Sequence, residues 1–401
     1  MTGRDPLDGV RIVSLAGQYP GPYATLLLAD LGADIIFVER PDGGDPVRSF
    51  TSFFATVNRD KSSVVVDLKS SRGQDELLSL IATADVLIDG FRPGVLDRLG
   101  MGSLRLRETN PRLVIVSATG YGHTGPLAMR SGHDLTYRAE AGMLMLDGAT
   151  DRSSLPIADV LGAHGIVESV LLGLLTRHTT DPALDFDVSI FDTLISTLSI
   201  YLEPIWNGSE RGGFPAEPGY GTFTTADHRV IALGVAHEDK FWQALCVVLG
   251  MTDVKQLSRD ERFARHGELR RRISEAVGSF ESLALEERLL AYDVPFGQAR
   301  ELGEIATHPQ VVARGLTGTI QDNDRTYVRQ PLVIDGERPA KGRRVAPRLG
   351  EDDMEFLPDR RFAQGKEEHL QQDELGWRSR DNSGQAVETS DVQGLRGGFH
   401  D

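Results

Sequence analysis

Three acidic side chains and one histidine are the first candidates for chemistry in this 401-residue chain. His133 and Asp134 are adjacent in "RSGHDLTYRAEAG", directly before a predicted helix, and Asp159 opens the apolar run "LPIADVLGAHGIVESVLLGLL". Glu238 precedes another helical segment in "GVAHEDKFW". An aspartate at a helix start has a structural explanation, because it accepts a hydrogen bond from a free backbone N–H. The same place also suits a catalytic carboxylate beside N–H groups that hold an oxyanion.

His133 has no such structural explanation beside Gly132. An imidazole titrates near neutral pH, with a reference pKa of about 6.5, so His133 could move a proton. Glu238 could serve only as a helix-start acid that interacts favourably with the helix dipole. For each of these residues the structural and the catalytic interpretation stay open.

Basic residues gather near the predicted ends of strands. Arg40 closes "FVER", Arg92 lies in "DGFRPGV" with Arg98 soon after, and Arg59 and Lys61 lie in "NRDKSS". Open α/β sheets bind ligands beyond the carboxyl ends of their strands, and guanidinium groups match phosphate oxygens. The pattern indicates either a site for a phosphorylated ligand or a solvated surface with ion pairs.

Several common sites are not expected. The Gly-rich turn "AGQYPGPY" does not fit G-x-G-x-x-G, which argues against a nicotinamide dinucleotide, and the chain has no P-loop motif. No His/Cys spacing suits a metal, so no metal site is predicted. The chain has one cysteine, Cys246, which excludes an internal disulfide and favours a reducing compartment. Cys246 is predicted to be buried.

The composition predicts a cytoplasmic protein. A net charge of −16 argues against nucleic acid or an anionic membrane as a main partner. No uninterrupted apolar run is long enough to span a bilayer, and the N-terminal residues do not resemble a signal peptide.

The first half of the chain alternates strand and helix patterns, which predicts a doubly wound parallel sheet, here a large α/β domain over residues 1–200. Residues 17–23, "GQYPGPY", are predicted as a turn, and helices are predicted over 24–33 and 70–83. The predicted strands are near-continuous apolar runs, as expected for strands that are covered on both faces: residues 9–16, 34–40, 62–68, 84–91 and 112–120.

A smaller α+β domain is predicted over residues 222–318, after a Gly- and Pro-rich connection at 201–221. It would begin with a hairpin that turns at 226–229 and continue with helices over 238–251, 263–280 and 284–291. Residues 330–360 are expected to pack back and complete the large domain. The polar stretch 361–401 is expected to be a mobile tail or a surface strap.

Several motifs in order resemble the class III CoA-transferase superfamily, which includes α-methylacyl-CoA racemase. The likeness runs through "LDGVRIVSLAGQYPGPYATLLLADLGADIIFVERPDGGDPVR", "NRDKSSVVVDLKS", "ADVLIDGFRPGVLDRLG" and "VSATGYGHTGP" to "PFGQARELGEIATHPQVVARG" and "VAPRLGED". It covers roughly residues 7 to 358. The resemblance implies an interlocked homodimer that binds an acyl-CoA thioester between the large domain of one chain and the small domain of the other. It implies no cofactor, since CoA enters with the substrate, and it implies these CoA-binding residues: Arg40, Val66, Asp67, Leu68, Lys69, Gly90, Phe91, Arg92, Arg98, Gly132 and Tyr137.

Within the superfamily, "GHDLTY" is similar to the racemase pattern. That likeness implies His133 as a catalytic base, Asp159 as the second acid/base, Glu238 as support for His133, and Asp134 as a residue that caps and orients. In the transferase branch, Asp159 would instead be the nucleophile. A third interpretation is a non-catalytic CoA-binding subunit of a heteromer.

The racemase interpretation is the main prediction from the sequence. Inverting the α-carbon of a 2-methyl-branched acyl-CoA requires one group to remove a proton and another to return it on the opposite face, through an enolate. The family's Gly-rich run after the carboxylate is replaced by "DVLGAHG", whose bulkier residues favour the racemase and an atypical substrate. Burial would raise the pKa of Asp159 and a helix N-terminus would lower it, and the sequence leaves that balance open.

Overall fold

The computed structural model describes residues 5–146, 155–177, 179–181, 183–210, 212–213, 216–320, 324–339 and 344–357. All candidate site residues lie within these ranges, whereas the predicted polar tail over 361–401 lies outside them.

A six-stranded parallel sheet forms the centre of the larger body, with the strand order β3-β2-β1-β4-β5-β6. This is the order of a doubly wound sheet, so the predicted fold class is confirmed. Side chains alternate between the two faces: Ile12 of β1 joins one core cluster, and Val13 joins the other. The strands are β1 (Arg11–Ser14), β2 (Asp34–Glu39), β3 (Ser62–Val65), β4 (Val86–Asp89), β5 (Val114–Thr119) and β6 (Asp185–Ser189).

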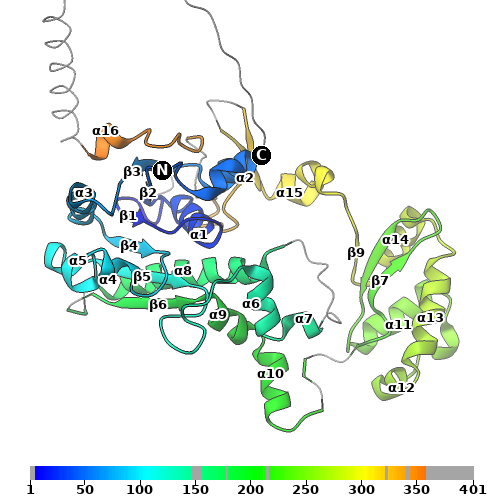
Figure 1. The fold of residues 1–401 in the computed structure, drawn as a ribbon. Helices are drawn as coiled ribbons and strands as arrows, with labels where there is room; N and C mark the ends of the chain where they lie inside the picture. The colour runs from blue at the N-terminus through cyan, green and yellow to red at the C-terminus, as the bar shows by residue number, and fades with distance from the viewer. Residues whose placement is uncertain are drawn as a thin grey trace, which may run out of the picture.

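Helices cover both faces of this sheet (Figure 1). On one face α1 and α8 bury Leu28 and Ile166 against the strands, and on the other α3 and α5 bury Leu77 and Leu106. The helices of this body are α1 (Pro20–Ala29), η1 (Pro46–Ser49), α2 (Thr51–Val57), α3 (Ser71–Ile81), α4 (Val95–Arg98), α5 (Ser103–Thr109), α6 (Asp134–Glu140), α7 (Met143–Leu146), α8 (Ile157–Thr176), α9 (Ile190–Thr197) and α10 (Ser199–Trp206).

By length and apolar composition alone, α8 could also cross a membrane. In the structure, however, Ile166 and Val170 of this helix are buried in the core beside the sheet.

Helix α1, strand β6 and helix α10 are among the elements that differ from the sequence prediction. Helix α1 begins at Pro20, inside the predicted turn, because proline at the first helical position lacks an N–H that would be unpaired there anyway. Strand β6 was not predicted, since "DFDVS" is a short sheet-edge strand with alternating polar residues. Helix α10 lies within the predicted connection and contains Pro204.

A second, smaller body has its own core, built around Trp242, Leu269 and Leu285. The predicted hairpin is present as β7 and β8, and β9 adds a third antiparallel strand. Cys246 is buried in this core, as predicted. Figure 1 shows this body to one side of the large sheet, joined by the segments before β7 and after β9. Its elements are β7 (Tyr220–Thr224), β8 (Val230–Gly234), α11 (Asp239–Val248), η2 (Thr252–Val254), α12 (Arg259–Ala264), α13 (His266–Val277), α14 (Ser282–Ala291) and β9 (Phe296–Gln298).

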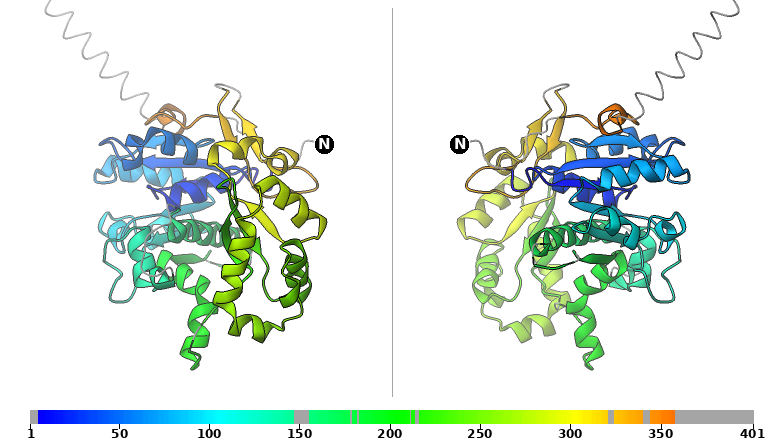
Figure 2. Two further views of the ribbon diagram at one scale, coloured as in Figure 1. Left: turned by 90° about the vertical axis from the view of Figure 1, so that its right-hand side faces the viewer. Right: turned by 90° about the vertical axis from the view of Figure 1, so that its left-hand side faces the viewer.

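The chain then returns to the large body. Asp352 accepts a hydrogen bond from the backbone N–H of Ser63 at 2.8 Å, and Gln330 donates to the carbonyl of Leu27 at 3.2 Å. Figure 2 shows this returning segment, in yellow and orange, beside the blue N-terminal elements. It contains η3 (Leu302–Thr307), α15 (Pro309–Ala313), β10 (Thr317–Thr319), β11 (Thr326–Val328) and α16 (Asp353–Phe356).

A buried ion pair stabilises this return. Nη2 of Arg59 donates to Oδ2 of Asp30 at 2.7 Å, and both side chains are only 3% exposed. The same guanidinium lies 4.4 Å from the ring centroid of Tyr327 and donates to the carbonyl of Val328 at 3.3 Å. One cation therefore connects α1, the segment before β3 and β11.

We expect Asp30→Asn to lower the free energy of unfolding by about 3–5 kcal/mol, because it leaves Arg59 buried without its principal carboxylate. Urea unfolding followed by circular dichroism measures this loss. The matched control is Asp34→Asn. Asp34 pairs with Arg11, their side chains are 42% and 37% exposed respectively, and this pair should contribute less than about 1 kcal/mol. Equal losses in the two variants would contradict the role given to the buried pair.

Candidate active site

The carboxyl ends of neighbouring parallel strands meet at one edge of the sheet. Arg40 follows β2, residues 66–69 follow β3, and Gly90, Phe91 and Arg92 follow β4. Arg98 is the last residue of α4. The predicted CoA-binding residues of the first hundred positions thus lie beyond strand ends or on the short helix after one of them. Contact with CoA stays a prediction for all of them.

Two of the predicted CoA-binding positions, Gly90 and Gly132, require glycine because other groups approach closely. A Cβ atom at Gly90 would lie 2.7 Å from Cα of Ala16, where the loop after β1 passes β4. A Cβ atom at Gly132 would lie 2.4 Å from Cε1 of Tyr137. The Tyr137 ring packs edge-on against Tyr121, with ring centroids 5.1 Å apart. Gly132 and Tyr137 therefore form one packed unit at the start of α6.

Asp159 lies in the first turn of α8, which begins at Ile157 after an N-cap at Pro156. It therefore lies inside the helix and not at the predicted capping position before it. Burial raises the pKa of Asp159 to about 7, and the negative charge of Asp134 adds to that rise. Burial and the charge of Asp134 both favour the protonated form of Asp159.

Asp134 connects the two helices of the site. It is the first residue of α6, and its Oδ1 accepts a hydrogen bond from the backbone N–H of Ala158 at 2.7 Å. Its Oδ2 lies 3.4 Å from Nη1 of Arg138. The sequence indicated that Asp134 could cap its own helix, whereas the carboxylate instead binds a free N–H at the start of α8. This contact fixes the backbone next to Asp159.

Two tyrosines interact electrostatically with Asp159. Tyr137 was predicted from the sequence only as a CoA-binding residue, and Tyr19 was not predicted as a site residue. Burial raises the pKa of Tyr137 to about 12, with the charge of Asp159 as the next cause. Burial also raises the pKa of Tyr19 to about 12, followed by the charges of Tyr23 and Asp159. Tyr19 stacks on Tyr23 at 5.4 Å and packs against Phe53 at 5.5 Å. Tyr19 lies in the segment after β1, beyond the carboxyl end of a strand, where open α/β sheets bind ligands. This position could have identified Tyr19 as a candidate from the sequence.

The turn before Tyr19 has a strained backbone. Gln18 has a φ of 62°, a left-handed conformation that is uncommon for residues other than glycine. Its backbone N–H donates to Oδ2 of Asp45 at 2.9 Å, which holds the turn in place. Strain of this kind concentrates at functional sites, which makes Gln18 a further candidate that the sequence did not indicate.

His133 and Glu238 lie apart in the single chain. His133 is the exposed N-cap residue of α6, its backbone N–H donates to Oγ1 of Thr136 at 2.9 Å, and it is not among the causes that shift the pKa of Asp159. Glu238 is the N-cap residue of α11 in the smaller body, with its Oε2 3.7 Å from Nδ1 of His237. Figure 1 shows α6 and α11 well separated. The structure therefore gathers Asp134, Tyr137 and Asp159, while the catalytic role of each residue stays a prediction.

A carboxyl group with a pKa of about 7 exists in both protonation states near neutral pH. The ionised form can attack a carbonyl carbon or remove a proton, and the protonated form can return one. The geometry of one chain thus permits nucleophilic catalysis as well as acid–base catalysis at Asp159.

Comparisons with known proteins show the family and agree with the fold. The pattern of CoA-transferase family III matches residues 7–353. The chain is 30% identical to a succinate–glutarate CoA-transferase from Agrobacterium fabrum, over 89% of this chain and 96% of that protein. It is 30% identical to an acetyl-CoA:oxalate CoA-transferase from Acetobacter aceti, over 87% of this chain and 94% of that one. The crystal structure of a CAIB/BAIF family protein from Brucella suis matches with a TM-score of 0.78 and 27% identity, over 89% of this chain and 100% of that chain.

We expect Asp134→Asn to lower the pKa of Asp159 below about 7, because the variant removes the nearby negative charge. The pKa should stay above the ordinary value of 3.8, since burial persists and the amide oxygen can still accept from Ala158. Carboxyl ¹³C NMR of the folded protein across pH 4–9 measures the midpoint. Asp192→Asn, which changes an exposed acid in the first turn of α9, is the control. An unchanged midpoint in Asp134→Asn would show that the two carboxylates do not interact.

Proposed function

The chain belongs to CoA-transferase family III, and we propose that it transfers CoA between carboxylic acids through covalent intermediates on Asp159. The observation that carries this proposal is the half-buried carboxylate of Asp159, whose pKa is raised to about 7, next to Asp134 and at the edge where the predicted CoA residues gather. Relatives at 30% identity over most of their length are named CoA-transferases, which supports transfer over the racemase predicted from the sequence.

The reaction needs one nucleophile and no redox change. The ionised carboxylate of Asp159 attacks the thioester carbonyl, which forms a mixed anhydride and releases CoA as its thiolate. The thiolate then attacks the Asp159 carbonyl, releases the first acid and leaves CoA bound to Asp159 as a thioester. A second carboxylate repeats these two steps in reverse and leaves as the new acyl-CoA. CoA thus enters only as part of the substrate, and the proposal includes no other cofactor.

The environment of Asp159 suits this chemistry in two ways. A carboxylate of raised pKa is more basic and therefore a stronger nucleophile than an ordinary aspartate. The N–H groups of Ile157 and Val160 already donate to the carbonyls of Leu155 and Pro156, and that of Ala158 donates to Asp134. The backbone N–H of Asp159 is therefore the donor that this first turn offers to the oxyanion at the attacked carbonyl.

Inversion of a 2-methyl-branched acyl-CoA is the second candidate, and one observation favours it. His133 directly precedes Asp134 on the loop that leads into the site, where its exposed imidazole is open to a substrate. This mechanism requires His133 and Asp159 on opposite faces of the α-carbon, with Glu238 beside His133. Because one chain holds Glu238 on the smaller body, the racemase depends on a second chain for that contact, whereas the transferase needs only Asp159.

We include a homodimer in the proposal. Helix α10 extends from the large body in Figures 1 and 2, and it exposes Ile200 and Ile205 by 50% each and Trp206 by 68%. Apolar side chains gathered in this way are typical of a surface that another protein covers. A second copy of the chain would cover them and could bring its smaller body, with Glu238, toward the site.

We expect Asp159→Ala to lower CoA transfer by about 10⁴-fold or more, because it removes the nucleophile. His133→Ala should stay within about tenfold of the wild type, since a lost acid/base would cost about 10²–10⁴-fold. The wild-type rate should rise with pH as Asp159 ionises, with a midpoint near its pKa of about 7. Exchange of labelled acids into acyl-CoA measures all three.

Two further readouts separate the candidates. Hydroxylamine added with acyl-CoA should inactivate the wild type by capturing the covalent state, and it should leave an Asp159 hydroxamate for mass spectrometry. Incubation in heavy water should give no α-deuterium. Deuterium uptake that is lost in His133→Ala, without any hydroxylamine sensitivity, would establish the racemase and overturn the transferase.

Light scattering of the purified protein should give twice the mass of one chain. Trp206→Glu should shift the protein toward one chain, because a charge on α10 disfavours burial of that helix. Leu104→Glu on α5 is the matched control, since Leu104 is 82% exposed on another part of the large body. A wild-type protein that is active as a single chain would contradict the dimer.

A further inference from the structure

A cavity of about 530 Å³ lies on the smaller body, outside the site built around Asp159. It opens between β7 and α13, and its residues are Thr222, Phe223, His266, Gly267, Arg270, Arg271, Ser274 and Glu275. The charges of Arg271 and Glu275 cancel in an ion pair, so Arg270 leaves this cavity with a net positive charge, in a chain whose net charge is −16. The charge of this cavity therefore runs opposite to that of the whole protein.

Arg270 is held rigidly at the wall of this cavity. Its Nη1 donates to the carbonyl of Tyr220 at 3.1 Å, and its Nη2 lies 3.5 Å from the carbonyl of Thr222. Its guanidinium carbon lies 4.6 Å from the ring centroid of Phe223. These contacts cover the carbonyl groups of an edge strand, and they also fix the guanidinium in one place before any ligand arrives.

The charge of Arg270 is not neutralised by any carboxylate within the described part of the chain. Its bonds go to backbone carbonyls, which leave the full positive charge at the cavity. The neighbouring arginines differ, because each has an acidic partner: Arg265 with Glu268 at 2.6 Å, Arg271 with Glu275 at 2.7 Å, and Arg272 with Asp253 at 2.7 Å.

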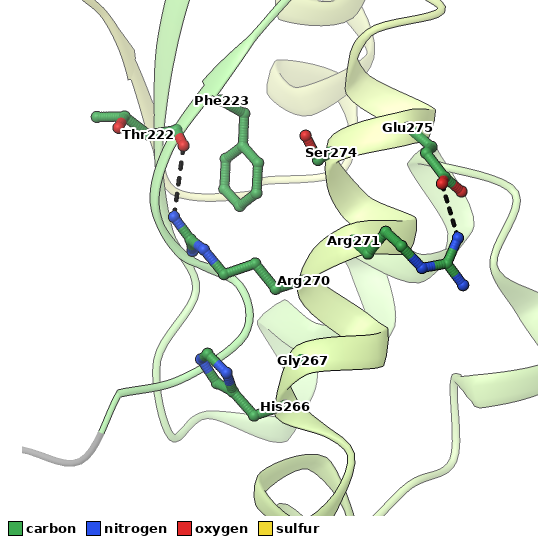
Figure 3. A pocket seen from close by; sticks show the side chains of 8 residues that line it. All are labelled: Thr222, Phe223, His266, Gly267, Arg270, Arg271, Ser274 and Glu275. Atoms are coloured by element: carbon green, nitrogen blue, oxygen red, sulfur yellow. Dashed lines mark hydrogen bonds and ion pairs between the residues drawn. The ribbon is translucent and has the colours of Figure 1, made fainter.

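Further donors share the face of α13 that carries Arg270. His266, Arg270 and Ser274 are spaced four residues apart, which places them on one side of a helix. Figure 3 shows these three side chains toward β7, with the Arg271–Glu275 pair on the other side of α13. Gly267 also lines the cavity, and the space beside it is open, since a Cβ atom there would meet no other atom within 4 Å.

We propose that this cavity binds a phosphate monoester of a small metabolite. The guanidinium of Arg270 and the hydroxyl of Ser274 donate to the phosphate oxygens, while the organic part of the ligand extends along α13 toward His266. A phosphate offers three terminal oxygens to donors from several directions, whereas a carboxylate offers two in one plane. The cavity falls in the size range of small-molecule sites, which is more space than the phosphate alone occupies.

The test is calorimetric titration of the full-length protein with adenosine 5′-monophosphate, inorganic phosphate and succinate at one ionic strength. We expect the monophosphate to bind most tightly, phosphate more weakly, and succinate not at all. Arg270→Gln should weaken binding of the monophosphate by about 10- to 100-fold, the range for a hydrogen bond to a charged group. Phosphate binding as tight as that of the monophosphate would show that the organic part is not recognised and would overturn the ester assignment.

A second variant keeps the proposal testable if loss of Arg270 disturbs the edge of β7. Ser274→Asp changes an exposed residue, keeps the Arg270 side chain, and places a negative charge on the same face of α13, where it neutralises the positive charge of the cavity. It should abolish binding of the monophosphate without a change in melting temperature.

Arg288→Gln is the matched control, because Arg288 also stacks on a phenylalanine of the smaller body, 5.0 Å from the ring of Phe280, but lies outside the cavity. It should bind like the wild type. Binding that both Arg270→Gln and Ser274→Asp leave unchanged would place the ligand elsewhere, as on the arginines of the large body, and would overturn the proposal. Tighter binding of succinate than of the monophosphate would overturn it as well.

Discussion

The two-sided burial of the parallel sheet determines where everything else in the large body lies. Strands with apolar side chains on both faces must be covered twice, so each crossover carries a helix that packs back on the sheet. Helix α8 connects β5 to β6 and therefore runs opposite to the strands, which brings its first turn to the carboxyl edge. Burial of Ile166 and Val170 thus places Asp159 where the loops after β1, β2 and β4 also meet.

At that edge the structure holds two carboxylates close together, and this arrangement costs stability. Asp134 and Asp159 repel each other when both are ionised, and burial of Asp159 adds to the cost. The pKa of Asp159 is about 7 in the folded state and 3.8 in the unfolded state. The stability that protonation of Asp159 contributes is therefore fully present below about pH 4. That contribution is lost as the pH rises through 7. The hydrogen bond from Ala158 to Asp134 offsets part of the cost and explains why the pair persists.

The sequence predicted the elements whose side-chain pattern is a consequence of burial. Five strands of the sheet were recognisable as near-continuous apolar runs, whereas β6 was not, because an edge strand with alternating aspartates lacks that pattern. The start of α1 could not be predicted from Pro20, because proline is favourable both in a turn and at the first helical position. Asp159 could be singled out as an acid before an apolar helix. Asp134 was singled out as well, as a cap for its own helix, but its proximity to Asp159 was not predicted, since it depends on how α6 packs beside α8, 24 residues along the chain.

The two reactions that the family resemblance allowed differ in which groups the fold must bring to the substrate. A two-base racemase requires a second group that the protein holds against the face of the substrate opposite Asp159, and His133 is exposed with its expected support, Glu238, on another body. The nucleophile of a transferase needs only what one chain already assembles, a basic carboxylate at a helix start near the ligand-binding edge. A histidine that directly precedes Asp134 in the sequence is compatible with either reaction, because sequence adjacency fixes the backbone but not the direction of the imidazole. The proposal of a transferase therefore rests on the environment that each group meets in the fold, and among the candidates Asp159 is the acid whose pKa that environment raises.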